Sequence, residues 1–251
     1  MTRFACALMC IAAMSSAATP REALLAAKHT ASEANFRNDQ AGMHAAIADL
    51  DRLAPDPTVG AQALYWAAWT EWLLSASEAV GGDPAKAMAT IESSARHIRR
   101  ALELRPDDAD NHAMLTWSLV AITSIDATRW KELAPEVSAH RRRALELGLR
   151  NPRVVMMDAG LIFYTPPQAG GSQEKGIARW LEALDLLAHE TIADPTQPDW
   201  GRTLADGWLA NLYLAMTPPH GTEARAAAEK ALAERPDFWF VTTQVLPKIP
   251  K

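Results

Sequence analysis

Apolar residues recur at helical spacing along most of this chain, whereas alternation with a period of two is nearly absent. Spacings of three and four residues are typical of amphipathic helices that bury one face. Ala, Leu, Glu and Arg, which favour helices, are abundant, and β-branched runs are few. The pattern therefore predicts an all-α protein.

Prolines interrupt the helical pattern at regular intervals. They are Pro55, Pro106, Pro152, Pro195 and Pro236, and successive ones lie 51, 46, 43 and 41 residues apart. Proline cannot continue a helix, and it disfavours helical geometry in the residue before it. Each interval is long enough for two helices and two turns. We therefore expect about five antiparallel helical hairpins.

A second break divides several of these intervals. Residues 81–87 read Gly-Gly-Asp-Pro-Ala-Lys-Ala, and residues 170–176 read Gly-Gly-Ser-Gln-Glu-Lys-Gly. Gly permits the left-handed conformation that closes a helix, and Asp83 or Ser172 can cap the next one. A looser third version begins at His220. Because no strand precedes these glycines and no GxxxxGK[ST] pattern is present, a phosphate-binding loop is disfavoured.

One segment recurs almost unchanged. Residues 97–104 read His-Ile-Arg-Arg-Ala-Leu-Glu-Leu, and residues 140–147 read His-Arg-Arg-Arg-Ala-Leu-Glu-Leu. Self-similarity at a fixed distance is typical of stacked helical repeats. The recurrence therefore indicates a scaffold and does not by itself identify a ligand.

These units resemble the tetratricopeptide repeat, or TPR, whose helix pairs show a large-small-large pattern and end in Ala-Leu-x-Leu-x-Pro. The matching residues are Ser94, Ile98, Ala101 and Pro106 in one second helix, Met156, Ala159, Gly160 and Phe163 in a first helix, and Gly176, Trp180 and Ala183 in its partner. The resemblance covers about residues 20–240. It implies a right-handed solenoid whose first helices line a concave face and whose second helices form the convex face.

A weaker resemblance concerns the turns. The Gly-Gly-Asp/Ser-x-x-Lys-Ala/Gly segments are similar to those of extracytoplasmic TRAP transporter T-components, which are helical-repeat proteins. That resemblance implies an accessory role beside a solute-uptake system.

The first 18 residues resemble a secretion signal peptide. Arg3 supplies a positive start, residues 4–14 an apolar core, and residues 16–18 a small-residue cleavage site. The apolar core is too short to span a bilayer, which needs about 20 residues. We predict cleavage near Ala18, a single repeat domain over residues 19–251, and a periplasmic or secreted location; a buried first helix is the alternative.

Both cysteines, Cys6 and Cys10, lie within this segment. A mature chain without them has no disulfide, thiol nucleophile or cysteine metal site. Lipidation of Cys10 is the alternative, although Met9 stands where a lipoprotein signal has a small residue. The net charge of −5 argues against non-specific nucleic-acid binding, and no later run reaches transmembrane length.

The TPR resemblance implies that aromatic and apolar side chains of first helices lie on or near the concave face. Tyr65, Trp69 and Trp72 share one helix face at positions i, i+4 and i+7. The candidate binding residues are Tyr65, Trp69, Trp72, Trp117, Leu161, Tyr164 and Tyr213. An apolar groove suits a peptide, a protein segment or a small apolar ligand. Ordinary packing between hairpins is the alternative for each residue.

The repeated arginines form a second candidate site. Arg99, Arg100, Arg142 and Arg143 could bind phosphate or carboxylate groups if neighbouring repeats set them side by side. We favour a solvated convex face instead, in which Arg99 pairs with Glu103, and Arg142 with Glu146, at i, i+4.

Catalytic patterns are weak. The seven histidines show no HExxH or paired metal spacing, and no GxSxG segment is present. We therefore predict no enzyme activity, metal or cofactor, and a binding role with a protein or peptide partner. The apolar residues Phe238–Val241 are expected to cap the last hairpin, from about residue 236; a dimer contact is the alternative.

Overall fold

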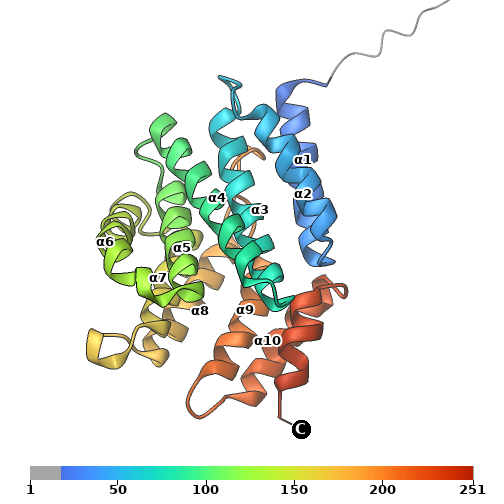
Figure 1. Cartoon of the computed structure of the whole chain (residues 1–251). Helices are drawn as coiled ribbons and strands as arrows, with labels where there is room; N and C mark the ends of the chain where they lie inside the picture. Colours follow the sequence, from blue (N-terminus) through green and yellow to red (C-terminus); the bar gives the residue numbers. More distant parts are fainter. Residues whose placement is uncertain (1–17, 251) are drawn as a thin grey trace, which may run out of the picture.

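The described part of the chain, residues 18–250 of a computed structural model, folds into five antiparallel helical hairpins (Figure 1). They pair α1 (Pro20–Phe36) with α2 (Gln40–Leu53), α3 (Gly60–Val80) with α4 (Pro84–Leu104), α5 (Ala109–Ile125) with α6 (Trp130–Leu147), α7 (Pro152–Tyr164) with α8 (Gln173–His189), and α9 (Arg202–Ala215) with α10 (Gly221–Glu234). The predicted all-α class and hairpins are confirmed. The predicted signal peptide up to Ala17, with both cysteines, lies outside the described residues.

The helix boundaries follow from the turn residues. Asp83 accepts a hydrogen bond from the Lys86 amide at 3.0 Å, and Ser172 accepts one from the Lys175 amide at 3.2 Å, so both cap the following helix as predicted. Gly82, with φ of 86°, adopts the left-handed conformation that closes α3. The third turn of this kind, which begins at His220, differs, because the His220 side chain makes no capping hydrogen bond to α10.

First and second helices have different surroundings. First helices contact one another, α1 with α3, α3 with α5, and α5 with α7, and the middle ones are apolar on nearly all sides. Second helices bury only one stripe, and those of neighbouring units are bridged by long ionic side chains such as Arg99 and Glu136. The first helices therefore form the inner side of the curved array and the second helices its outer side.

The C-terminal segment packs across the last hairpin. Phe238, Val241 and Val245 are buried, and Phe238 lies against Gly207 of α9. Its ring also makes an edge contact with Phe36 of α1, with centroids 5.0 Å apart. The segment thus covers the apolar side of α9 and α10 and joins the end of the array to its beginning.

An ion pair reinforces this joint between the two ends. Arg235 donates to Glu33 at 2.6 Å and to Asp237 at 2.9 Å, and its guanidinium lies 4.1 Å from the centre of the Phe36 ring. The hydrogen bond from Arg235 holds the pKa of the Glu33 carboxyl below its usual value. Figure 1 shows α1 and the C-terminal segment beside each other.

No helix between residues 18 and 250 combines the length and the apolarity that crossing a bilayer requires.

Two glycines of the fourth hairpin, Gly160 of α7 and Gly176 of α8, give a matched test of packing. A Cβ on Gly176 would lie 2.6 Å from Phe163 Cβ and 2.8 Å from its Cα, whereas a Cβ on Gly160 would meet nothing within 4 Å. We expect Gly176→Ala to lower the free energy of unfolding by about 1–3 kcal/mol through overpacking. Gly160→Ala should raise it by about 0.5–1 kcal/mol, because Ala favours the helix. Denaturant unfolding of both variants checks this, and equal effects would contradict the packing.

Candidate functional site

The inner side of the array contains one large aromatic cluster. Its members are Tyr65, Trp66, Trp69 and Trp72 of α3, Trp117 of α5, Trp180 of α8, Trp200, and Trp208 of α9. Neighbouring ring centroids lie 5.2 to 6.3 Å apart. Most pairs meet edge-to-face or tilted, which are arrangements that aromatic rings prefer. Seven of the chain's nine tryptophans therefore gather at one place.

Three members of the cluster are only partly buried, and we call Trp72, Trp117 and Trp208 the tryptophan surface. Trp72 and Trp117 stack with centroids 5.2 Å apart and planes at 17°. Trp208 presents its edge to both, at 5.5 and 5.9 Å. These rings come from three different hairpins, so the tertiary fold alone brings them together. Accessible apolar groups gathered in this way are typical of binding sites.

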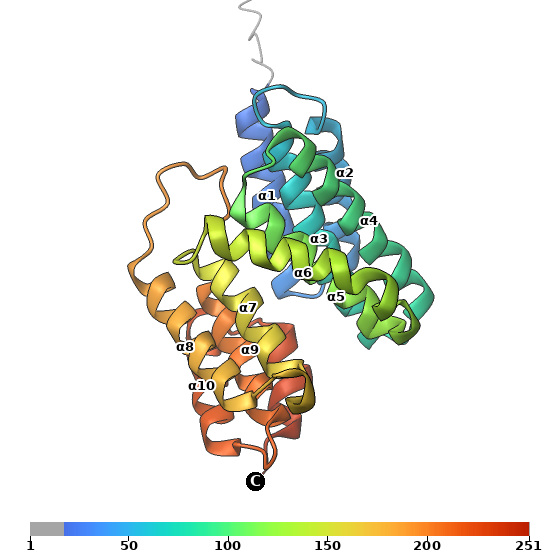
Figure 2. The same cartoon turned by 90° about the vertical axis from the view of Figure 1, so that its left-hand side faces the viewer.

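A segment without helix or strand, residues 190–201, separates α8 from α9 and lies against α1 and α3; we call it the strap (orange in Figure 2). The Trp66 indole N–H donates to the Thr196 carbonyl at 2.9 Å. The Trp200 indole N–H donates to the Tyr65 hydroxyl at 2.8 Å. Thr196 and Trp200 are both buried. The strap thereby shields the part of the cluster nearest α1 from solvent.

Ion pairs hold the strap at both ends and in the middle. Arg21 of α1 pairs with Asp194 at 2.9 Å, and Lys28 of α1 pairs with Asp199. Near the start of the strap, Glu190 accepts two hydrogen bonds, at 2.6 and 2.9 Å, from the guanidinium of Arg153 in α7. Each acidic side chain of the strap is therefore matched by a basic side chain of the array.

The guanidinium that binds Glu190 belongs to Arg153 of α7, which is only 2% exposed and lies 5.6 Å from the Trp200 ring centre. Asp110 lies in the same region. The residue as a whole is partly accessible, but its carboxyl group is enclosed and accepts a hydrogen bond from the side-chain amide of Asn151 at 2.8 Å. Burial raises the pKa of Asp110 to about 6, although the charge of Arg153 opposes the shift.

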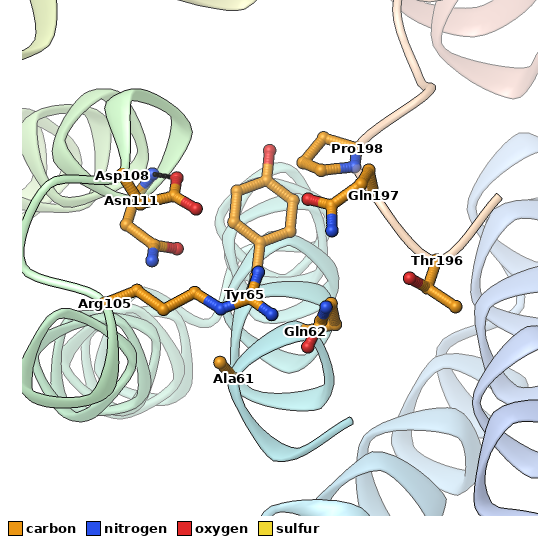
Figure 3. Close-up of a pocket in the computed structure, with 9 residues that line it drawn as sticks. All are labelled: Ala61, Gln62, Tyr65, Arg105, Asp108, Asn111, Thr196, Gln197 and Pro198. Atoms are coloured by element: carbon orange, nitrogen blue, oxygen red, sulfur yellow. Dashed lines mark hydrogen bonds between the residues drawn. The ribbon is translucent and has the colours of Figure 1, made fainter. Parts of the chain in front are cut away.

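Several polar atoms beneath the strap lack partners. Asp110 Oδ1, Arg153 Nε and Gln62 Oε1 are buried without a hydrogen bond within the protein. Gln62 lines a hollow of about 10 Å³, together with Ala61, Tyr65, Arg105, Asp108, Asn111, Thr196, Gln197 and Pro198 (Figure 3). This volume accommodates about one water molecule. In Figure 3 the Tyr65 ring stands between the α5 side and the strap residues Gln197 and Pro198.

The structure divides the predicted aromatic residues of α3. Tyr65 and Trp69 are 4% and 1% exposed and lie behind the strap, so a ligand reaches neither while the strap is in place. Trp72 instead meets Trp117, the predicted residue of α5, on the tryptophan surface. Tyr65, Trp69 and Trp72 therefore share one face of α3 as predicted, but the first two are buried and Trp72 is partly exposed.

The remaining predicted residues lie away from the strap. Leu161 is half-buried and packs on the same small group of buried residues as Trp117. Tyr164 is 61% exposed and makes an edge contact with Phe163. Tyr213 stacks on His220, with planes at 7°. Tyr164 and Tyr213 therefore share no ring contact with the tryptophan surface.

The arginine repeats engage in ion pairs between units. Arg99 donates two hydrogen bonds, each 2.9 Å long, to Glu136 of α6 and thus pairs with this residue instead of the expected Glu103. Arg143 pairs with Asp107 of the preceding turn at 2.6 Å. The second helices are far enough apart for long side chains to bridge them, which the sequence spacing alone could not indicate.

The expected pairing of the other copy is also different. Glu146 accepts from Arg143 at 3.2 Å, an i, i+3 pair, and not from Arg142. Arg100 and Arg142 are exposed on the outer side. An open depression of about 440 Å³ lies on α6 and is lined by Ser138, Arg141, Arg142, Leu145 and Glu146. Because carboxylates occupy Arg99 and Arg143, the four guanidinium groups do not form one free anion site.

The histidines take part in packing between helices. His97 lies 2.7 Å from Glu71 and 3.0 Å from Asp51; burial lowers its pKa, but Glu71 and Asp51 outweigh this, so the net shift is upward. His112 and His140 approach within 2.7 Å through their Nδ1 atoms. Burial and the His112 charge lower the pKa of His140. Within residues 18–250 no group of three or more His, Cys, Asp or Glu side chains could hold a metal ion.

Sequence reasoning missed the strap and the residues around Arg153. One available signal was length, because the segment from Glu190 to Gly201 is longer than the other turns between hairpins. A second was composition, since this segment contains two prolines and a tryptophan. No local pattern pointed to Arg153 or Asp110, because their partners lie far away in the chain.

Two solved structures share this arrangement of helices. The HusA haemophore from Porphyromonas gingivalis superposes with a TM-score of 0.66 at 20% identity, covering 81% of this chain and 97% of that one. TTC0263, a thermophilic TPR protein in Thermus thermophilus, superposes with a TM-score of 0.56 at 16% identity, covering 90% and 98%. No protein-family model and no curated protein sequence matches. The chain is thus a TPR-like helical-repeat protein by its fold.

The raised pKa of Asp110 leads to a pH-dependent prediction. Its folded pKa of about 6 exceeds its ordinary value of 3.8, so the carboxyl group favours the folded state at low pH, and this contribution is lost as the pH rises from 4 through 6. Between pH 4 and 7 we expect the stability of Asp110→Asn to gain about 2–3 kcal/mol relative to the unsubstituted protein. Urea unfolding across this range measures the difference. Asp185→Asn, at an exposed site on α8, should show no such trend.

Proposed function

We propose that this TPR-like scaffold is an extracytoplasmic, non-enzymatic binding protein that holds an apolar segment of a partner protein on the tryptophan surface. The observation that carries this proposal is the meeting of Trp72, Trp117 and Trp208, which come from three hairpins and remain partly exposed. Large aromatic rings held by a rigid scaffold are efficient anchors, because few rotatable bonds are frozen on binding.

The shape of the site supports a protein segment over an enclosed small ligand. The hollow beneath the strap has room for about one water molecule, whereas the rings of the tryptophan surface are partly exposed. The extracytoplasmic location rests on the signal-like pattern of residues 1–18. An accessory role in solute uptake stays a prediction from the resemblance of the turns.

A second candidate is the carriage of a planar apolar ligand such as haem. The fold likeness to a haemophore, over 97% of that protein's chain, favours it. The stacked pair of Trp72 and Trp117 also offers a flat ring face of suitable chemistry. Haem would be cargo in this case, and it would bind by ring stacking on the same surface.

Substitutions on the tryptophan surface test both candidates. We expect Trp72→Ala and Trp117→Ala to weaken binding by about 2 kcal/mol or more each, because they remove anchors. Trp130→Ala is the matched control, since Trp130 is 47% exposed on α6, away from the cluster. Circular dichroism and thermal unfolding establish that each variant is folded.

Two measurements distinguish the candidates. Affinity capture from an extracytoplasmic extract compares which proteins are retained by the unsubstituted protein and by Trp72→Ala, Trp117→Ala and Trp130→Ala. A haemin titration follows quenching of tryptophan fluorescence in the same proteins. A captured protein lost only with Trp72→Ala and Trp117→Ala supports segment binding, and haemin binding with the same pattern supports the carrier. If neither substitution alters retention or quenching, the tryptophan surface is not the site.

A further inference from the structure

The strap lies on the inner face in the manner of a bound peptide that contains one turn, at Asp194–Gln197. Residues 190–201 contain no helix or strand, and the only backbone hydrogen bond within their described part joins Gln197 to Asp194. Asp194 also accepts hydrogen bonds from the Thr196 amide and hydroxyl, at 3.1 and 2.8 Å. The remaining hydrogen bonds and ion pairs of the strap are made to the array. The carbonyl groups of Pro195 and Thr196 accept hydrogen bonds from Lys28 Nζ and the Trp66 indole, at 2.6 and 2.9 Å.

The chemistry of the two sides is complementary. Facing the strap, α1 and α7 supply the cations Arg21, Lys28 and Arg153, and α3 supplies indole and phenol groups. The strap supplies three carboxylates and the Trp200 ring, which packs between rings of α3, α5 and α9. We call these side chains of α1, α3 and α7 the wall of the groove. The wall is suited to backbone carbonyls, acidic side chains and one large aromatic residue.

The fit between strap and wall is incomplete. Buried polar atoms of a protein are nearly always hydrogen-bonded, yet Gln62 Oε1, Asp110 Oδ1 and Arg153 Nε have no protein partner, and the hollow lined by Gln62 holds about one water molecule. Within the strap, exposed residues such as Thr191, Ala193 and Asp199 alternate with partly or fully buried ones. A segment held by a few anchors over a partly unpaired surface can be exchanged for another with similar anchors.

We infer that the strap is an internal occupant of a peptide groove, and that the partner of this protein is a non-helical acidic segment bearing a tryptophan, which displaces the strap. This inference rests on the proposed binding function and goes beyond it, because it adds a second contact site, beneath the strap, that takes an acidic part of the partner. The strap competes from within the same chain, where the effective concentration is about millimolar for short linkers. A segment that binds weakly therefore cannot displace the strap. A substitution that weakens the contacts of the strap makes the groove more accessible.

A synthetic peptide with the sequence of residues 190–201, carrying a fluorophore at its N-terminus, tests the inference by fluorescence anisotropy. Two variants weaken the strap: Asp199→Asn removes the charge that pairs with Lys28, and Trp200→Ala removes the ring. We expect each variant to bind the peptide about tenfold or more tightly than the unsubstituted protein. Asp185→Asn, exposed on α8, is the control and should bind as the unsubstituted protein does. A peptide with Ala in place of its tryptophan should not bind.

Folded variants that bind the peptide no better than the control overturn the inference. If Trp200→Ala fails to fold, Asp199→Asn and hydrogen exchange on the unsubstituted protein decide it. Millimolar peptide should then speed exchange of the strap amides without affecting α10, and unchanged strap exchange also overturns it.

These outcomes are separable from those of the proposed function. Absence of peptide binding, together with a partner that depends on Trp72 and Trp117, refutes only the strap inference. Trp72→Ala separates the two sites, because Trp117 also contacts Trp200 whereas Trp72 makes no ring contact with it. Peptide binding that Trp72→Ala leaves unchanged, with no other ligand found, places recognition beneath the strap and refutes the tryptophan surface.

Discussion

The packing of Trp200 against the rings of α3, α5 and α9 is the contact on which the inner side of this protein depends. Its indole donates to the Tyr65 hydroxyl, 135 residues earlier in the chain, and its ring lies within 6.0 Å of three other tryptophan rings, measured between centroids. One side chain from a loop therefore connects the second, third and fifth hairpins. Removing it would expose Tyr65 and Trp69, which are otherwise enclosed.

This connectivity sets the protein apart from a simple repeat array. In such arrays each repeat contacts mainly its neighbours, so the ends are independent. Here the strap joins the last two hairpins to α1 and α3, and the Arg235–Glu33 pair joins the C-terminal segment to α1. Contacts so distant in sequence connect the strap to the packing of the first hairpin. They also keep Tyr65 and Trp69 buried, whereas the tryptophan surface remains partly exposed.

The same arrangement explains the charge pattern of the array. Outer-side arginines are paired with carboxylates of adjacent units, as Arg99 is with Glu136. Exposed pairs of this kind contribute little stability, so their main effect is to keep the outer side polar. Inner-side cations are fewer and pair with the strap. The Arg153–Glu190 pair is the most buried of these, and removing one partner would be costly, because the other charge would remain uncompensated in a buried site.

The sequence by itself determined the local structure: the helical class, the hairpins, and the caps at Asp83 and Ser172. Helical periodicity, proline and capping residues act within a few positions, so they can be recognised in the linear chain. Tertiary structure alone decided that Tyr65 and Trp69 are enclosed while Trp72 is accessible, and that Arg99 pairs with Glu136. It also decided that residues 190–201 return to α1. These outcomes depend on contacts between residues tens to more than a hundred positions apart, for which no local pattern exists.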